Sequence, residues 1–185
     1  MIIESIFSTL GPDDQPNFAS MGITWGMSEL TVRPFRNTAT YRNLLATGYG
    51  VLSLTDDVLP FIQSSLYRAD LPHFPARHVP GVVLQGACSW RELQVLSVAG
   101  SSERAEVHCR IVHEEHLREF LGFCRASAAV LEAAILATRL NAHTPEAVHE
   151  IMQHYAQIVD KTGGDNDRRA FQLVEQFIRS SYDHA

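Results

Sequence analysis

Short stretches rich in β-branched and alternating apolar residues fill the first two-thirds of the chain and predict β-strands. Two connections between them have the composition of tight hairpins: residues 26–28, and residues 99–103, which contain a glycine and two serines. The stretch 69–81 carries three prolines and two histidines and is predicted to be a loop. The candidate strands are 2–10, 17–25, 29–35, 50–55, 82–98 and 104–112.

The spacing of apolar residues changes to a helical period near His113. Gly122 interrupts this helical part once, and the pair Gly163-Gly164 interrupts it again. Thr144, placed directly before a proline and a glutamate, has the signature of a helix N-cap. The candidate helices are 40–47, a segment from Asp56 or Asp57 to about 67, 114–121, 124–141, 144–160 and 165–180.

Strands followed by helices, without regular alternation of the two, indicate an α+β fold built on an antiparallel sheet. Strands of this length can close into a small barrel, which removes exposed sheet edges. We therefore predict a barrel domain with short helices over 1–112 and a C-terminal helical segment over 113–185. A chain of 185 residues needs no disulfide or structural metal to bury a sizeable core.

Composition narrows the class of protein. The net charge of −6 argues against a nucleic-acid binder, which usually carries a basic stripe. The three cysteines show no CxxC spacing and fit a reducing compartment. No apolar run is long enough to span a bilayer, and the N-terminal residues lack the basic start and apolar core of a secretory signal. We expect a cytoplasmic protein without nucleic-acid or membrane partners.

The stretch 31-TVRPFRNTATYRNL-44 concentrates hydrogen-bond donors where a strand is predicted to run into a helix. Hydroxyls, an arginine and the N–H groups of a helix start are what a phosphate needs, and the positive end of the helix would face it. A simpler interpretation is that Asn37 or Thr38 caps the helix and the arginines are solvated. The donors are Arg33, Arg36, Asn37, Thr38, Thr40 and Tyr41.

Three other segments allow two interpretations each. Gly22 within a strand would let a flat ligand approach the backbone, or it marks a β-bulge or bend. Glu132 lies in the alanine-rich segment 125–140, where a carboxylate is either catalytic or paired with Arg125, Arg139 or a backbone donor. The segment 161-KTGG-164 would hold an anion, or it ends a helix through left-handed glycines with Lys161 near the helix C-terminus.

A metal site and several common enzyme motifs have little support. His108, His113 and His116 lie near Glu114 and Glu115, but the spacing matches no H-E-x-x-H or Cys/His pattern. The chain contains no P-loop or dinucleotide-binding glycine motif, and no serine in the G-x-S-x-G context of a hydrolase. We therefore expect no metal, and the catalytic residues stay unknown at this stage.

The ordered set of segments resembles a family of uncharacterised archaeal and bacterial proteins with the FMN-binding split-barrel fold. The resemblance covers nearly the whole chain, and its wider relatives are flavin reductases and pyridoxamine-phosphate oxidases. No single segment is specific, but the set in this order is. The segments are 16-PNFASMGI-23, 32-VRPFRNTATYRNL-44, 53-SLTDD-57, 122-GFCRASAAVLEAAILATRL-140 and 161-KTGG-164.

The resemblance implies an antiparallel split barrel, a homodimer and FMN bound near the subunit interface. It implies a phosphate group held by Asn37, Thr38, Thr40 and Tyr41, with Arg33 as charge partner. Many relatives have Asn where this chain has Cys124, which puts a polar role there in doubt. Gene context links the family to tetrahydromethanopterin-dependent one-carbon metabolism. The residues implied along or beside the flavin ring are Met21, Gly22, Arg33, Pro34, Phe35, Thr55 and Asp56.

Two functions follow from these implications. The first is an FMN-dependent oxidoreductase of flavin-reductase type acting on a small molecule, in which the flavin supplies the chemistry and no side-chain nucleophile is needed. The second is a binding protein that holds FMN or another phosphorylated ligand without turning it over. Whether the chain is an enzyme stays open, and a metal-dependent protein is a third, weaker interpretation.

Overall fold

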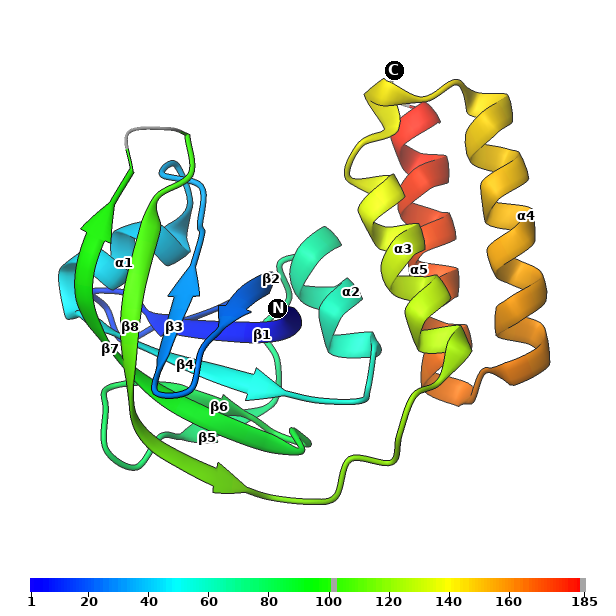
Figure 1. Cartoon of the computed structure of the whole chain (residues 1–185). Coiled ribbons are helices and arrows are strands. Elements are labelled where there is room, and N and C mark those ends of the chain that lie inside the picture. Colours follow the sequence, from blue (N-terminus) through cyan, green and yellow to red (C-terminus); the bar gives the residue numbers. More distant parts are fainter. Residues whose placement is uncertain (101–102, 184–185) are drawn as a thin grey trace. The chain divides into compact units, whose positions relative to one another are not determined.

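The computed structural model describes residues 1–100 and 103–183, which form two compact units. The first unit comprises residues 1–55 and 68–120, and the second comprises 56–67 together with the residues from 121 onward. The first unit consists of strands and helix α1 (Ala39–Thr47), and helices make up the second (Figure 1).

Six antiparallel strands of the first unit close into a barrel in the order β1-β2-β3-β8-β7-β4. The predicted α+β fold with an antiparallel barrel is therefore confirmed. The hairpin at 26–28 joins β2 to β3, and β7 pairs along its length with β8; residues 101–102 of the second predicted hairpin lie outside the described residues. The barrel strands are β1 (Ile2–Leu10), β2 (Pro16–Trp25), β3 (Glu29–Val32), β4 (Tyr49–Leu54), β7 (Ser89–Ala99) and β8 (Glu106–His116).

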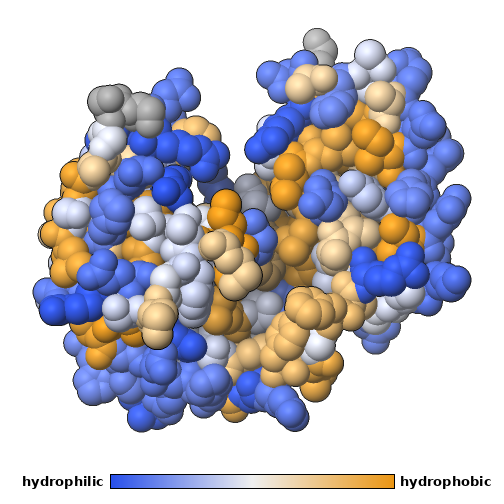
Figure 2. All heavy atoms as spheres, viewed as in Figure 1, coloured by the Kyte–Doolittle hydropathy of each residue, from blue (hydrophilic) through white to orange (hydrophobic). Residues whose placement is uncertain are grey.

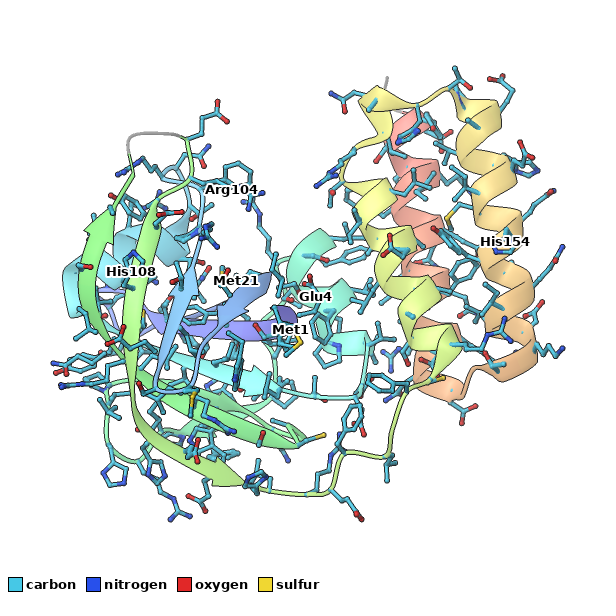
Figure 3. The ribbon with its side chains drawn as sticks, viewed as in Figure 1. Met1, Glu4, Met21, Arg104, His108 and His154 are labelled. Atoms are coloured by element: carbon cyan, nitrogen blue, oxygen red, sulfur yellow. The ribbon has the colours of Figure 1, made fainter. Side chains whose placement is uncertain are left out.

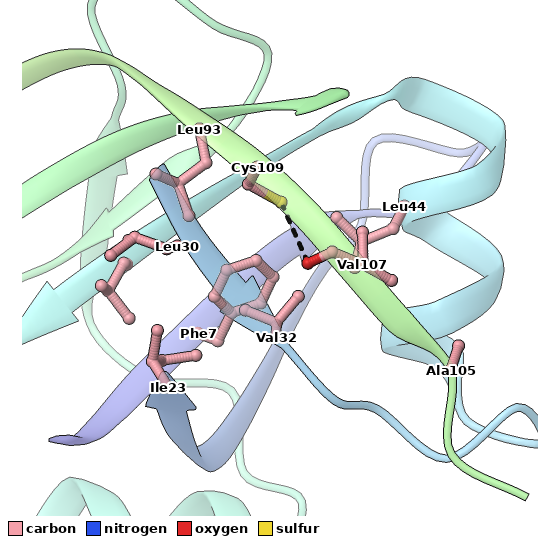
Figure 4. Packing of buried hydrophobic residues seen from close by; sticks show 10 residues of the cluster. Phe7, Ile23, Leu30, Val32, Leu44, Leu93, Ala105, Val107 and Cys109 are labelled. Atoms are coloured by element: carbon pink, nitrogen blue, oxygen red, sulfur yellow. Dashed lines mark hydrogen bonds between the residues drawn. The ribbon is translucent and has the colours of Figure 1, made fainter. Parts of the chain in front are cut away.

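The barrel interior is filled by apolar side chains that alternate along the strands (Figure 4). Phe7 lies at its centre, and Leu44 of helix α1 (Ala39–Thr47) packs into the same cluster. Gly50 has no side chain because a Cβ there would stand 2.5 Å from the ring of Phe7. The cluster comprises Phe7, Ile23, Leu30, Val32, Leu44, Leu52, Leu93, Ala105, Val107 and Cys109.

A small two-stranded sheet, β5 (His73–Pro75) with β6 (Val82–Leu84), lies within the segment predicted to be a loop and a long strand. The loop prediction over 69–81 is thus only partly right, because strand β5 lies inside this stretch and pairs with β6, which follows it. The fully buried carboxylate of Glu92 accepts hydrogen bonds from the backbone N–H groups of Arg77, His78 and Val79 at 2.7–2.9 Å. These bonds attach the loop before β6 to the barrel.

As far as its residues are described, the second unit contains four α-helices and one 3-10 turn. Helix α3 packs against both α4 and α5, and its alanines allow close approach. Thr144 caps α4 as predicted, accepting a hydrogen bond from the N–H of Ala147 at 3.3 Å. Apolar residues also appear on the surface of this unit (Figure 2), including Ile135 of α3. The elements are α2 (Leu59–Leu66), α3 (Arg125–Ala137), η1 (Leu140–Ala142), α4 (Pro145–Thr162) and α5 (Asp165–Asp183).

The helix expected over 114–121 is wrong, because β8 continues to His116 and pairs with β7. The polar residues at 114–116, whose composition resembles the start of a helix, belong to strand β8. Arg91 of β7 binds Glu114 at 2.9 Å between Nε and Oε2. Cross-strand pairing satisfies the backbone of this segment, so its polar composition does not require a helix.

Two expectations about the helical unit are also corrected. Glu132 is exposed, so no buried carboxylate needs a partner at that position. Gly163, the C-cap of α4, is not left-handed: with φ −81° and ψ 143° its backbone is extended. A Cβ there would stand 2.7 Å from the carbonyl oxygen of Val159 and 3.3 Å from the Cβ of Ala126. Close helix packing, rather than backbone handedness, explains this glycine.

Candidate functional site

The turn that follows β3 leads directly into α1 and carries the densest group of predicted site residues. Thr38 is the N-cap of α1, and its Oγ1 accepts a hydrogen bond from the Tyr41 N–H at 3.3 Å. The same hydroxyl donates to the carbonyl oxygen of Phe35 at 2.7 Å. The capping interpretation is therefore confirmed for Thr38, and the hydroxyl hydrogen is already engaged within the turn.

Thr40 faces inward and is 3% exposed. Its Oγ1 accepts a hydrogen bond from the Asn17 side-chain amide of β2 at 3.0 Å. Asn43, one turn further along α1, donates to Oγ1 of Thr9 at 3.1 Å, and Asn17 also reaches that oxygen at 3.4 Å. This network attaches α1 to β1 and β2, so the Thr40 side chain holds the helix in place.

The N-terminus of α1 carries uncompensated positive charge. Its first turn contains no acidic residue. The guanidinium of Arg42 folds back to donate from Nη1 to the carbonyl oxygen of Asn37 at 3.0 Å, which places a cation at the positive end of the helix. The N–H groups of Ala39 and Thr40 have no acceptor within the helix by its geometry. The arrangement favours an anion.

Two further arginines of the turn make specific contacts. Arg33 forms an ion pair with Glu106 of β8 at 3.0 Å and donates to Oγ1 of Thr24 at 2.6 Å, on the outer face of the barrel. Arg36 donates to the phenolic oxygen of Tyr41 at 2.5 Å, and its guanidinium lies 5.2 Å from the centre of that ring. Arg33 and Tyr41 are thus both engaged within the protein.

The connection between β7 and β8 closes one side of this turn. The Arg36 N–H donates to the carbonyl oxygen of Glu103 at 2.9 Å, and the Ala105 N–H donates to that of Pro34 at 3.1 Å. The guanidinium of Arg104, labelled in Figure 3, lies 3.9 Å from the centre of the exposed Phe35 ring. These contacts bring two segments distant in sequence to one place.

A pocket of about 430 Å³ adjoins the turn, a volume within the range of small-molecule sites, roughly 300–1,000 Å³. Phe35 contributes an apolar ring, Arg36 a cation, and Asn37 an exposed amide next to the start of α1. Glu103 also lines the pocket and contributes a negative charge, opposite to that of Arg36. The pocket thus combines a flat apolar surface with polar groups that can orient a ligand.

Met21 and Gly22 are neighbours on β2 and therefore face opposite sides of the strand. Met21 packs against the barrel core. Gly22 pairs in regular register with Glu4 of β1, so the β-bulge interpretation is wrong there. A Cβ at Gly22 would stand 2.7 Å from Cγ2 of Ile2, which explains the glycine through close packing of β1 side chains.

Thr55 and Asp56 follow β4 at the point where the chain passes between units. Thr55 belongs to the first unit and Asp56 to the second, where an Asp56 oxygen accepts a hydrogen bond from the Leu121 N–H at 2.9 Å. Asp57 accepts a hydrogen bond from the Leu59 N–H at 3.0 Å, but the N-cap residue of α2 is Val58 and not the predicted Asp56 or Asp57. Contact of Thr55 and Asp56 with a ligand stays a prediction.

The histidine-rich end of β8 does not form a metal cluster. Within residues 1–100 and 103–183, no three His, Cys, Asp or Glu side chains are grouped so that they could hold a metal ion. Strand alternation separates the candidates: His113 and Glu115 contact one another at 3.3 Å, whereas His116 lies on the other face. His108 instead contacts Oγ1 of Thr31 at 3.2 Å.

The cysteines of the chain are free thiols. Burial in the barrel core raises the pKa of Cys109 to about 12, so that it is protonated and unreactive at neutral pH. Among the described helices, none is both long enough and apolar enough to cross a membrane.

Sequence reasoning missed several residues that the structure brings to the turn. Asn17 and Arg104 are distant in sequence, and nothing in their local pattern identifies them. Arg42 carried a detectable signal, since a cation in a helix start that lacks acidic residues is electrostatically unusual.

Comparison with solved structures places the fold. An FMN-bound protein from Methanosarcina mazei has a TM-score of 0.80 and 23% sequence identity, over 95% of this chain and 94% of its own. An FMN-binding protein from Thermus thermophilus matches with a TM-score of 0.56 and 17% identity, over 62% of this chain and 70% of its own. Flavoredoxin of Desulfovibrio vulgaris matches with a TM-score of 0.54 and 15% identity, over 63% and 70%.

Family models match both parts of the chain. The model described as "Protein of unknown function (DUF447) N-terminal domain" matches residues 3–118, and the model described as "Protein of unknown function (DUF447)" matches residues 124–176. The M. mazei protein carries the same family assignment. Two matches in the order of the family's own parts account for nearly all of the sequence. The chain therefore belongs to the DUF447 family.

Proposed function

We propose that this protein binds FMN in the pocket beside the start of α1. The observation that carries the proposal is the likeness, over almost the whole length of both chains, to a family member that is FMN-bound. The local structure agrees with this ligand: an acid-free helix start, an exposed amide at Asn37 and a pocket of about 430 Å³ lie together. A phosphate group is suited to such a helix start.

In the proposed complex the protein's own groups bind and orient the cofactor. The N–H groups at the start of α1 and the Asn37 side chain hold the phosphate, while Phe35 supplies a flat apolar surface. Met21, Gly22, Pro34, Thr55 and Asp56 stay candidates for the ring environment. Bound flavin would supply electron and hydride transfer. Thr38 and Thr40 act mainly by positioning α1, because both hydroxyls have partners inside the protein.

A titration of the purified protein tests FMN binding. Added FMN is expected to lose fluorescence and shift its absorbance as it enters a protein site, with saturation at one FMN per chain. Riboflavin, which lacks the phosphate, serves as the matched ligand. A protein that neither carries flavin nor changes the spectrum of added FMN would contradict the proposal.

We propose further that the flavin turns over, in a reaction of the flavin-reductase type. The support is the fold, which the chain shares with flavoredoxin of D. vulgaris. The alternative is a binding protein that holds FMN without using it. Anaerobic mixing of the FMN complex with NADH or NADPH separates the two: rapid bleaching supports an oxidoreductase, and oxidised flavin that persists with both donors supports the binding protein.

The connection with tetrahydromethanopterin-linked one-carbon metabolism is part of the same proposal and rests on the family resemblance alone. Its test is direct electron exchange. The FMN complex, once reduced, is mixed anaerobically with oxidised forms of the pterin, and reoxidation of the flavin is followed. Reoxidation faster than in a pterin-free control supports the connection. Equal rates would exclude the pterin as an electron acceptor.

Two further parts of the proposal concern assembly and location. A homodimer is supported by apolar side chains at the surface of the barrel unit, including Ile2 of β1 and Leu96 and Val98 of β7, all more than a third exposed. Sedimentation equilibrium tests it, and a monomer at micromolar concentration would refute it.

A cytoplasmic location is supported by the free thiols, which persist in reducing compartments.

A further inference from the structure

Four arginines belong to the turn before α1 or contact it, and three of them have other roles. Arg33 is paired with Glu106 on the outer face of the barrel. The guanidinium of Arg36 donates hydrogen bonds to the Tyr41 hydroxyl and to the carbonyl oxygen of Gly100, and that of Arg104 lies over the ring of Phe35. Moving any of these three toward a phosphate would break contacts that the folded protein already makes.

Arg42 differs from the other three in position and partners. It is exposed, and within the part of the chain that the structure describes its side chain makes a single hydrogen bond, to the carbonyl oxygen of Asn37. That contact holds the guanidinium beside the first turn of α1. The remaining N–H groups of the guanidinium are accessible to solvent or to a ligand.

The position of Arg42 is unfavourable unless an anion shares it. A helix N-terminus carries a partial positive charge, and a cation there is repelled by it. The first turn of α1 contains no acidic residue to offset this repulsion. A bound phosphate dianion would reverse the sign, because it is attracted both by the guanidinium and by the helix start.

We propose that Arg42 is the charge partner of the FMN phosphate and that it makes the site select FMN over riboflavin. The inference rests on the proposed function, since it names a residue of the same site. It replaces Arg33 in the role that the family resemblance implies for it. The guanidinium binds the phosphate through N–H groups not used by Asn37, and riboflavin receives no benefit because it carries no phosphate.

The experiment compares the affinities for FMN and riboflavin in three full-length variants. Arg42→Met removes the charge and keeps the length of the side chain. Arg33→Met tests the competing assignment, and Arg179→Met on α5 is the matched control for loss of one exposed arginine. Dissociation constants are measured by flavin fluorescence at low and at high ionic strength.

Arg42→Met is expected to bind FMN about 10- to 100-fold more weakly than the wild type, because it loses one charge-assisted hydrogen-bonded pair. Its riboflavin affinity should stay within about twofold, and its FMN affinity should depend less on salt. Arg33→Met and Arg179→Met should both retain the preference of the wild type for FMN.

Three outcomes overturn the inference, and each is distinct from failure of the proposed function. Unchanged affinities for both FMN and riboflavin in Arg42→Met show that Arg42 does not contact the phosphate. Loss of the ratio in Arg33→Met alone returns the role to Arg33. Equal weakening of both flavins in Arg42→Met shows a structural effect. By contrast, a wild-type protein that binds neither flavin refutes the proposed function itself.

Discussion

The side-chain amide of Asn17 donates a hydrogen bond to the buried hydroxyl oxygen of Thr40 at 3.0 Å, joining strand β2 to helix α1. This contact separates two roles that are hard to distinguish from sequence. A threonine at a helix start can bind a ligand or secure the helix, and the bond from Asn17 supports the second role for Thr40. Its mutation should therefore affect stability before it affects ligand affinity.

Thr40→Val, which keeps the shape and removes the acceptor, is expected to lower the free energy of unfolding by about 1–2 kcal/mol, because Asn17 then loses a partner in a buried setting. Urea unfolding followed by circular dichroism measures it. FMN affinity of the folded variant should change by less than about threefold. A large loss of FMN affinity with unchanged stability would instead place the Thr40 hydroxyl on the phosphate.

A charged substitution at Thr38 distinguishes its role as a helix cap from a role in anion binding. Aspartate caps helices about as well as threonine, so Thr38→Asp should retain the stability of the fold. It also places a negative charge where the phosphate is proposed to bind, and FMN affinity should fall at least about tenfold.

Thr38→Ser and Thr38→Ala complete the series at that position. The serine variant is expected to match the wild type in both measurements. The alanine variant should lose about 1 kcal/mol of stability through loss of the cap. If Thr38→Asp binds FMN as tightly as the wild type does, the phosphate does not lie at this helix start.

Glu92 provides a pH-dependent test of the loop that precedes β6. Burial by itself raises the pKa of this carboxyl, but hydrogen bonds from the Arg77 N–H, the Trp90 indole and the N–H groups of His78 and Val79 outweigh it and lower the pKa below the usual value. A lowered pKa in the folded state means that the stabilisation is present above the unfolded-state pKa. It is lost as the pH falls through the folded-state pKa.

Glu92→Gln removes this dependence. At pH 7 the variant is expected to be about 1–3 kcal/mol less stable than the wild type, because charge-assisted bonds become neutral ones and one oxygen becomes a donor. The difference in stability between the two proteins should shrink as the pH falls from about 5 toward 3. A difference that stays constant over this range would show that ionisation of Glu92 does not stabilise the fold.

Alanine substitutions at Gly163 and Gly164 test why two glycines follow α4. A Cβ at Gly163 would stand 2.7 Å from the Val159 carbonyl oxygen, a rigid backbone atom, whereas at Gly164 the nearest atom is a side-chain oxygen of Asp167 at 3.7 Å. Gly163→Ala is therefore expected to cost about 1–3 kcal/mol of stability. Gly164→Ala should cost less than about 1 kcal/mol. Thermal unfolding of both variants measures this, and equal costs would contradict the packing argument.

Much of the barrel was predictable because its information is local. Alternating apolar residues and turn composition identified β1, β2, β3, β4 and the pairing of β7 with β8. The cap residues Thr38 and Thr144 could also be identified from the sequence, since a cap bonds to a backbone group only three residues away. The failure at 114–121 has the opposite cause: outward-facing charged residues look alike on a strand and on a helix, and only the partner strand decides between them.

The sequence by itself determined the fold class, the strand-to-helix turn at 31–44 and, through the ordered resemblance, the family of the chain. Only the tertiary structure decided the roles of the polar residues in that turn. It buried Thr40 against Asn17, paired Arg33 with Glu106, and left Arg42 exposed beside the start of α1. The physical reason is that availability for a ligand depends on which partners the rest of the fold supplies, and those partners lie on strands far away along the chain.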